Sequence, residues 1–110
     1  MNDEVKKYLH DILKSIDSID EFTGEKKTFN TYTKNKQLKR AVERELEIIG
    51  EAVNRALKIS PELKIENKKK IVQTRNLIIH AYDSVNDEII WSIVIIHLPK
   101  LKVEIIELLK

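Results

Sequence analysis

Apolar residues recur every three or four positions along most of the chain, which is the spacing of one face of an α-helix. From Asp3 to about Glu21 this spacing gives a single stripe, made of Val5, Leu9, Ile12, Ile16 and Ile19. A second stripe spans about Asn35 to Ile59 and contains Leu38, Val42, Leu46, Ile49, Val53, Ala56 and Leu57. The pattern predicts two long amphipathic helices, each with one face turned to a common core.

The two glycines fall at informative places. Gly24 follows the first stripe and is a natural helix terminator, because glycine accepts the left-handed geometry that closes helices. Gly50 lies inside the second helix, where it costs about 1 kcal/mol relative to alanine. It therefore marks either a close helix–helix approach or a functional position. Residues 25–33 are predicted to form a loop, tethered by Phe29 and Tyr32.

A third helix is expected from about residue 67 to residue 82 or 83, and Asn86 or Asp87 would cap a fourth. The fourth helix continues to His97, and Pro99 either kinks it or begins a short fifth helix. The whole chain, residues 1–110, is predicted to be one all-α domain. Its architecture would be an antiparallel up-and-down bundle of four to five helices.

The fourth predicted helix is apolar around too much of its circumference for a half-exposed helix. Only Ser92 and His97 interrupt its run of Ile, Val and Trp residues between positions 89 and 97. A helix of this kind must be covered on more than one side. In so small a chain the missing cover is expected to come from a second copy, so the pattern predicts a homodimer with two-fold symmetry.

Composition narrows the possible functions. The 20 basic and 18 acidic residues nearly balance, which argues against a surface dedicated to coating nucleic acid but leaves room for a local basic patch. Cysteine is absent, so disulfides, thiolate metal sites and cysteine nucleophiles are excluded. The N-terminus lacks the form of a signal peptide, and the most apolar stretch is about half the length that spans a bilayer. We expect a cytoplasmic protein without a membrane segment.

Four polar residues interrupt the apolar pattern of the third helix: Arg75, Asn76, His80 and Tyr82. At about 100° per residue, His80 lies roughly 40° around the helix from Asn76, and Tyr82 roughly 20° from Arg75. The four side chains therefore share about half of the circumference. Conflicts between apolar pattern and polar residues often mark functional sites. A guanidinium beside an imidazole, which titrates near neutrality, suits phosphate chemistry.

Each of these residues also has an ordinary structural explanation. Arg75 could form a buried ion pair with Glu47 or Glu51 of the second helix. His80 could be a hydrogen-bonded core residue, and Tyr82 an amphipathic residue at the boundary of the core. The three histidines of the chain lack the spacing of a metal site, so no metal is expected.

The pattern R-x-x-x-x-H-x-Y, formed by Arg75, His80 and Tyr82, resembles the HEPN superfamily, specifically its HepT-like branch. Residues 45–52, with the sequence ELEIIGEA, look like the second helix of that family. Residues 85–101, with their Trp and Leu-Pro, look like its C-terminal helix pair. The resemblance covers about residues 3–109.

The resemblance implies a metal-independent endoribonuclease that acts as the toxin of a toxin–antitoxin pair. RNA carries its own nucleophile, the ribose 2′-hydroxyl, so such an enzyme needs no metal and no cofactor. His80 would transfer the proton, and Arg75 would bind the phosphate as negative charge builds. Asn76 would orient the imidazole or donate to the phosphate. In a symmetric dimer, one His80 could act as base and the other as acid.

The resemblance also implies a partner. In HepT-like pairs the antitoxin is a minimal nucleotidyltransferase that attaches AMP to the motif tyrosine, which is Tyr82 here. The anionic adduct would occupy the phosphate position beside Arg75 and neutralise it. Two alternatives stay open: a non-catalytic accessory subunit that binds a nucleotide or substrate for a nucleotidyltransferase, and a purely structural helical dimer.

Overall fold

The computed structural model describes residues 1–25, 27–80 and 85–110, and within them it contains helices and no strands. The elements are α1 (Asp3–Thr23), α2 (Phe29–Lys34), α3 (Lys36–Ile59), α4 (Lys68–His80), α5 (Asp87–Ser92), the π-helical segment η2 (Ile93–His97) and α6 (Leu98–Leu108). The prediction of an all-α fold is confirmed. In the described part of the chain, no helix has both the length and the apolar character needed to cross a membrane.

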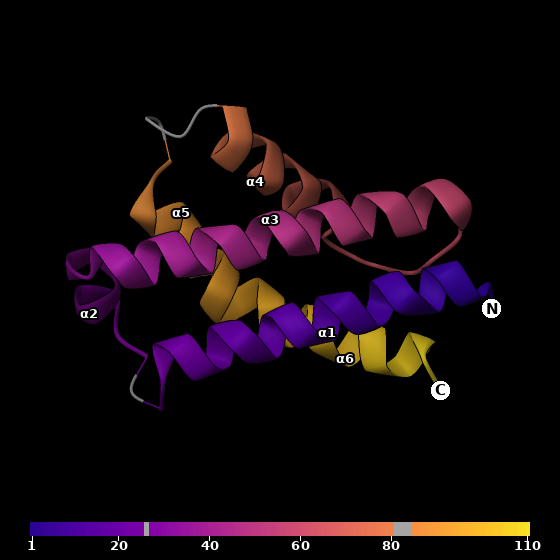
Figure 1. Cartoon of the computed structure of the whole chain (residues 1–110), viewed down its shortest axis with the longest axis horizontal. Helices are drawn as coiled ribbons and strands as arrows, with labels where there is room; N and C mark the ends of the chain where they lie inside the picture. The colour runs from indigo at the N-terminus through magenta and orange to yellow at the C-terminus, as the bar shows by residue number, and fades with distance from the viewer. Residues whose placement is uncertain (26, 81–84) are drawn as a thin grey trace.

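The long helices α1 and α3 lie side by side and run in opposite directions, and α4 returns along α3 (Figure 1). The predicted stripe of α1 is buried along its whole length. On α3 the central stripe residues are buried, and Leu38 and Leu57 at its ends pack partly buried against the core. Both helices begin at asparagine caps: the side chain of Asn2 accepts from the amide of Glu4 at 2.7 Å, and that of Asn35 from the amide of Leu38 at 3.0 Å.

The segment after α1 differs from the prediction. Gly24 ends α1 with a φ of 70°, as expected, but residues 29–33 form part of the short helix α2 and are not a loop. Thr28 caps this helix by accepting from the amide of Thr31. Tyr32 is fully buried and stacks on Trp91, with 5.1 Å between ring centroids. The residue that anchors this segment to the core is therefore Tyr32, since Phe29 is 37% exposed.

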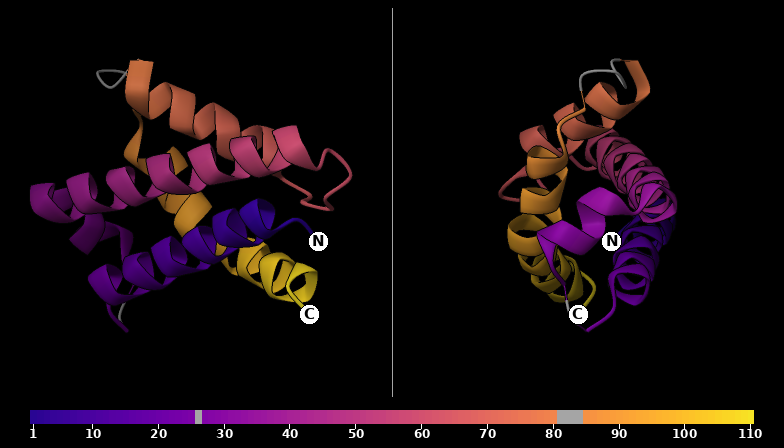
Figure 2. Two further views of the ribbon diagram at one scale, coloured as in Figure 1. Left: turned by 45° about the vertical axis from the view of Figure 1, so that its right-hand side comes forward. Right: turned by 90° about the vertical axis from the view of Figure 1, so that its left-hand side faces the viewer.

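The C-terminal helical segments form a layer against the α1–α3 pair (Figure 2). Asn86 caps α5, as predicted, by accepting from the amides of Glu88 and Ile89. Pro99 lies in the first turn of α6, where its missing N–H costs no helical hydrogen bond. One face of α5, η2 and α6 is buried in the core, whereas the opposite face exposes Ile89, Ile95, Ile96, Val103 and Ile106.

At Gly50, α3 and α4 approach closely. A Cβ atom built on Gly50 would collide with the Cβ of Arg75, and it would lie 3.0 Å from the Cγ of Arg75 and 3.3 Å from the carbonyl oxygen of Ile71. The structural explanation of Gly50, a close helix–helix approach, is therefore confirmed. The approach is made against Arg75 itself, so Gly50 sets where the stem of that side chain lies.

We predict that Gly50→Ala lowers the thermal midpoint of unfolding. Alanine favours the helix by about 1 kcal/mol, but forcing a methyl group against Arg75 should cost about 1–3 kcal/mol. Asn54→Ala, one turn further along α3, is the matched control, because it raises helix propensity at a partly exposed position. If Gly50→Ala melts as high as Asn54→Ala, the close approach does not constrain the fold.

Candidate functional site

The guanidinium of Arg75 reaches from α4 across to α3. Its Nη2 forms an ion pair with Glu51, and its Nη1 donates to the Oδ1 of Asn76 at 2.8 Å. The Nε of Arg75 is buried and has no hydrogen-bond partner among the described residues. The predicted ion pair is thus made with Glu51 and not with Glu47, which pairs with Arg44 at 3.1 Å.

Glu51 is shared between two arginines. Its other oxygen accepts from the Nε of Arg55 at 2.7 Å. This hydrogen bond, followed by the positive charge of Arg75, lowers the pKa of Glu51 below its usual value. The carboxylate therefore carries its charge at neutral pH. Because Glu51 also contacts solvent, its pairs belong to the weak, surface class.

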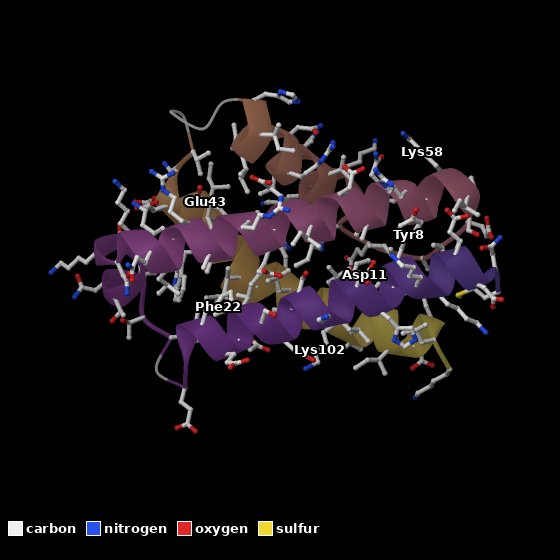
Figure 3. The ribbon with its side chains drawn as sticks, viewed as in Figure 1. Tyr8, Asp11, Phe22, Glu43, Lys58 and Lys102 are labelled. Carbon is white, nitrogen blue, oxygen red and sulfur yellow. The ribbon has the colours of Figure 1, made fainter. Side chains whose placement is uncertain are left out.

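A pocket of about 320 Å³ opens beside this cluster. Helix α3 contributes the charged residues Arg44, Glu47, Glu51 and Arg55, and α4 contributes Arg75 and Ile79. The far wall comes from α1, where Tyr8 and Asp11 face α3 (Figure 3). The side chain of Arg75 is 24% exposed. It is consequently held by a carboxylate but remains within reach of a ligand in the pocket.

His80 and Asn76 lie outside this pocket lining. His80 is the last residue of α4 and is exposed, so its explanation as a core histidine is wrong. It follows Arg75 by about one and a half helical turns. Asn76 is also exposed, and its oxygen accepts from Arg75, whereas no hydrogen bond joins it to His80 within the described ranges. Tyr82 lies outside the described residues.

The other histidines are separate from this cluster. His10 is exposed on α1. His97 has a buried Nδ1 with no partner in the described part of the chain, and burial, reinforced by the charges of Lys70 and Lys100, lowers its pKa. Among the described residues, no three His, Asp or Glu side chains are placed to hold a metal ion.

Sequence reasoning missed Tyr8, Asp11 and Arg55. Arg55 could have been found, because Glu51 and Arg55 are four residues apart on one helix and such pairs face each other. Tyr8 and Asp11 could not, since their place in the pocket depends on how α1 packs against α3. The local sequence around them predicts only an exposed helical face.

Comparisons with known proteins agree with the motif. A family model described as ribonuclease HepT-like matches residues 12–108. One candidate RNase of Methanocaldococcus jannaschii is 39% identical over 97% of this chain and 88% of its own length. A second from the same organism is 38% identical over 93% of this chain and 94% of its own length. A candidate ribonuclease HepT of Thermococcus cleftensis is 37% identical over 88% of either chain. No solved structure matches significantly. The chain therefore belongs to the HepT-like ribonuclease family.

Proposed function

We propose that this ribonuclease is the toxin of a toxin–antitoxin pair and that it cleaves RNA internally without a metal. The observation that carries the proposal is how the Arg75 side chain is held. Its aliphatic stem packs against Gly50, while its guanidinium stays accessible at the edge of a pocket. An exposed His80 follows on the same helix. Family membership supplies the substrate class, RNA.

The proposed reaction needs only groups that RNA and this chain provide. The ribose 2′-oxygen attacks the adjacent phosphorus, and its proton passes to a base. The bond from phosphorus to the 5′-oxygen breaks, and that oxygen takes a proton from an acid. The products are a 2′,3′-cyclic phosphate and a free 5′-hydroxyl. His80 moves the proton, and Arg75 donates to the phosphate oxygens as charge accumulates on them.

Glu51 occupies the position that a substrate phosphate would take at Arg75. Surface ion pairs contribute only about 0–1 kcal/mol, so a phosphate can replace the carboxylate at small cost. Glu51 keeps its hydrogen bond from Arg55 when this happens. Asn76 accepts from Arg75 and thereby helps to orient the guanidinium. Glu47 lines the same pocket and is paired with Arg44, so its role is supporting.

A homodimer would provide two copies of His80, one to accept the proton and one to donate it. The support for a dimer is the exposed face of α5, η2 and α6, which carries the five aliphatic side chains named above. Exposed apolar patches of this kind often mark contacts between proteins. The acid and base roles then fall to different subunits, so mixed dimers with one His80→Ala subunit should lose far more than half of the activity.

We predict that wild type is a dimer at micromolar concentration and that Ile96→Glu combined with Val103→Glu is a monomer, as measured by light scattering. Both side chains are at least half exposed, at 50% and 67%, so helix content by circular dichroism should not change. Phe22→Glu, at an exposed position on α1 (Figure 3), is the control and should stay dimeric. A monomeric wild type would refute the dimer.

We predict that Arg75→Ala and His80→Ala each reduce the rate of RNA cleavage by about 100-fold or more, because each removes a group used in the transition state. Arg75→Lys should recover only part of the rate, since lysine lacks the planar guanidinium that donates two parallel hydrogen bonds to a phosphate. The measurement is cleavage of a labelled RNA, with the cyclic phosphate identified by mass spectrometry. His10→Ala, on the exposed face of α1, is the matched control and should cleave normally.

Other results would favour the alternative functions. If Arg75→Ala unfolds while His80→Ala remains fully active, the Arg75–Glu51 pair is structural only. Arg75→Ala also leaves the Glu51 carboxylate without its partner. Combining Arg75→Ala with Glu51→Gln removes that unpaired charge, so any defect that remains is due to loss of the guanidinium. A wild-type protein that binds nucleotides but cleaves no RNA would instead be an accessory subunit.

We further propose that a minimal nucleotidyltransferase neutralises the toxin at Tyr82. The hydroxyl oxygen of Tyr82 would attack the α-phosphorus of ATP, releasing pyrophosphate and leaving AMP on the phenol. The proposal is supported by family membership and by the position of Tyr82 in the motif, two residues after His80. The added phosphate would compete for Arg75 by the same charge-assisted hydrogen bonds as RNA.

We predict that Tyr82→Phe still cleaves RNA but is not inhibited by the partner. Incubation of wild type with the partner and ATP should add the mass of AMP and abolish cleavage, because the added phosphate would compete with RNA for Arg75. Tyr8→Phe, the tyrosine on α1 beside the pocket, is the control and should be modified normally. If Tyr82→Phe is modified and inhibited like wild type, another residue carries the AMP.

A further inference from the structure

Three pockets follow one another along α3 and share lining residues. The pocket beside Arg75 shares Arg44, Glu47 and Ile79 with a second pocket of about 380 Å³. The second shares Arg40 and Glu43 with a third, of about 340 Å³, which lies at the start of α3. We call this the α3 groove. In Figure 3, Tyr8 and Asp11, which line the first pocket, lie toward the opposite end of α3 from Glu43, which lines the third.

All four arginines of the chain line the α3 groove, namely Arg40, Arg44, Arg55 and Arg75. The other 16 basic residues are lysines, and most of them do not line the groove. Arginine is the better ligand for phosphate, because its planar guanidinium donates two parallel hydrogen bonds. The concentration of this residue type in one groove indicates a surface that recognises phosphates.

The net charge of the groove is positive at the start of α3. Near Arg75 and in the middle pocket, cations and carboxylates are equal in number. The third pocket has more cations, Lys34, Lys36, Lys39 and Arg40, than carboxylates, Glu43 and Asp87. Asp87 is neutralised by Lys39 at 3.0 Å, and burial raises the pKa of Glu43. Within the described residues, Lys34, Lys36 and Arg40 form no ion pair.

Tyr32, which precedes the pocket residue Thr33 in α2, has a buried hydroxyl group. Tyr32 is 0% exposed, and its hydroxyl has no hydrogen-bond partner among the residues that the structure describes. Burial, and then the charges of Glu43 and Asp87, raise the pKa of Tyr32. A buried donor without a partner is costly, and a water molecule enclosed beside it would satisfy it.

We propose that the α3 groove binds single-stranded RNA and that Lys36 and Arg40 hold a phosphate several nucleotides away from the bond cleaved beside Arg75. Arg40 and Glu51, the partner of Arg75, are separated by about 16 Å of helix. A stacked strand has one phosphate per about 3.4 Å, so about five nucleotides bridge this distance. Ile79, which is 41% exposed between the two ends, offers apolar contact to an unstacked base.

The test measures binding separately from cleavage, because the inference rests on the proposed function. The ligand is a 2′-deoxy single strand of about 20 nucleotides, which lacks the nucleophile and cannot be cleaved by the proposed reaction. We expect the double variant Lys36→Ala, Arg40→Ala to bind it more weakly and with a smaller salt dependence. The slope of log K against log salt should fall by about 0.7, the change expected for the one phosphate that the variant no longer neutralises.

The control removes two positive charges elsewhere. Lys14→Ala combined with Lys100→Ala changes exposed residues of α1 and α6 that do not line the groove, and its salt slope should equal that of wild type. On RNA, the groove variant should raise KM for a long strand and leave kcat unchanged. For a dinucleotide, which cannot reach the third pocket, both constants should be unchanged.

The outcomes for the groove and for cleavage can be told apart. If wild type cleaves RNA but the groove variant keeps the salt slope of the control, the groove does not bind RNA, and docking of a protein partner becomes the better explanation. If wild type cleaves nothing and the groove variant still shows a reduced salt slope, the groove is supported as a nucleic-acid surface and the nuclease proposal fails.

Discussion

The contact between Gly50 of α3 and Arg75 of α4 is the constraint on which the site depends. A side chain at position 50 would occupy the space taken by the Cβ and Cγ of Arg75. With glycine at position 50, the backbone of α4 can lie close to α3. The guanidinium of Arg75 then reaches Glu51. The cost of a glycine inside a helix, about 1 kcal/mol, is therefore offset by a close packing that places one functional group.

The stem and the head of Arg75 are held in different ways. The stem is fixed by packing, which is close to rigid because protein interiors have little free volume. The head is held by Asn76 and Glu51 at a solvent-accessible edge, where each interaction contributes little and can be exchanged. This arrangement removes the conflict between the structural and functional explanations of Arg75. The ion pair with Glu51 that supports the structural explanation would also keep the guanidinium oriented for the phosphate that we propose it binds.

The sequence predicted most of the helices because their stripes of apolar residues are local patterns. The stripe of α1 is buried as expected, and Asn86 caps α5. The short helix α2 was not predicted, since its stability depends on Tyr32 stacking against Trp91, a contact between segments far apart in the chain. The same limit applies to the site. The sequence predicted that Arg75 pairs with Glu47 or Glu51, and the structure has the pair with Glu51. The contribution of Tyr8 and Asp11 to the pocket beside Arg75 could not be predicted, because it depends on how α1 packs against α3.

Charge along α3 has one more consequence for how a substrate would approach. The nearly balanced composition gives the molecule no strong overall attraction for RNA, so any attraction must be local. Around Arg75 the carboxylates cancel the arginines, and the excess of positive charge lies at the other end of the groove. A strand held first at that end would reach Arg75 as an intramolecular step, at a high effective concentration. Displacement of Glu51 from Arg75 then needs only a weak phosphate contact, because the strand is already bound.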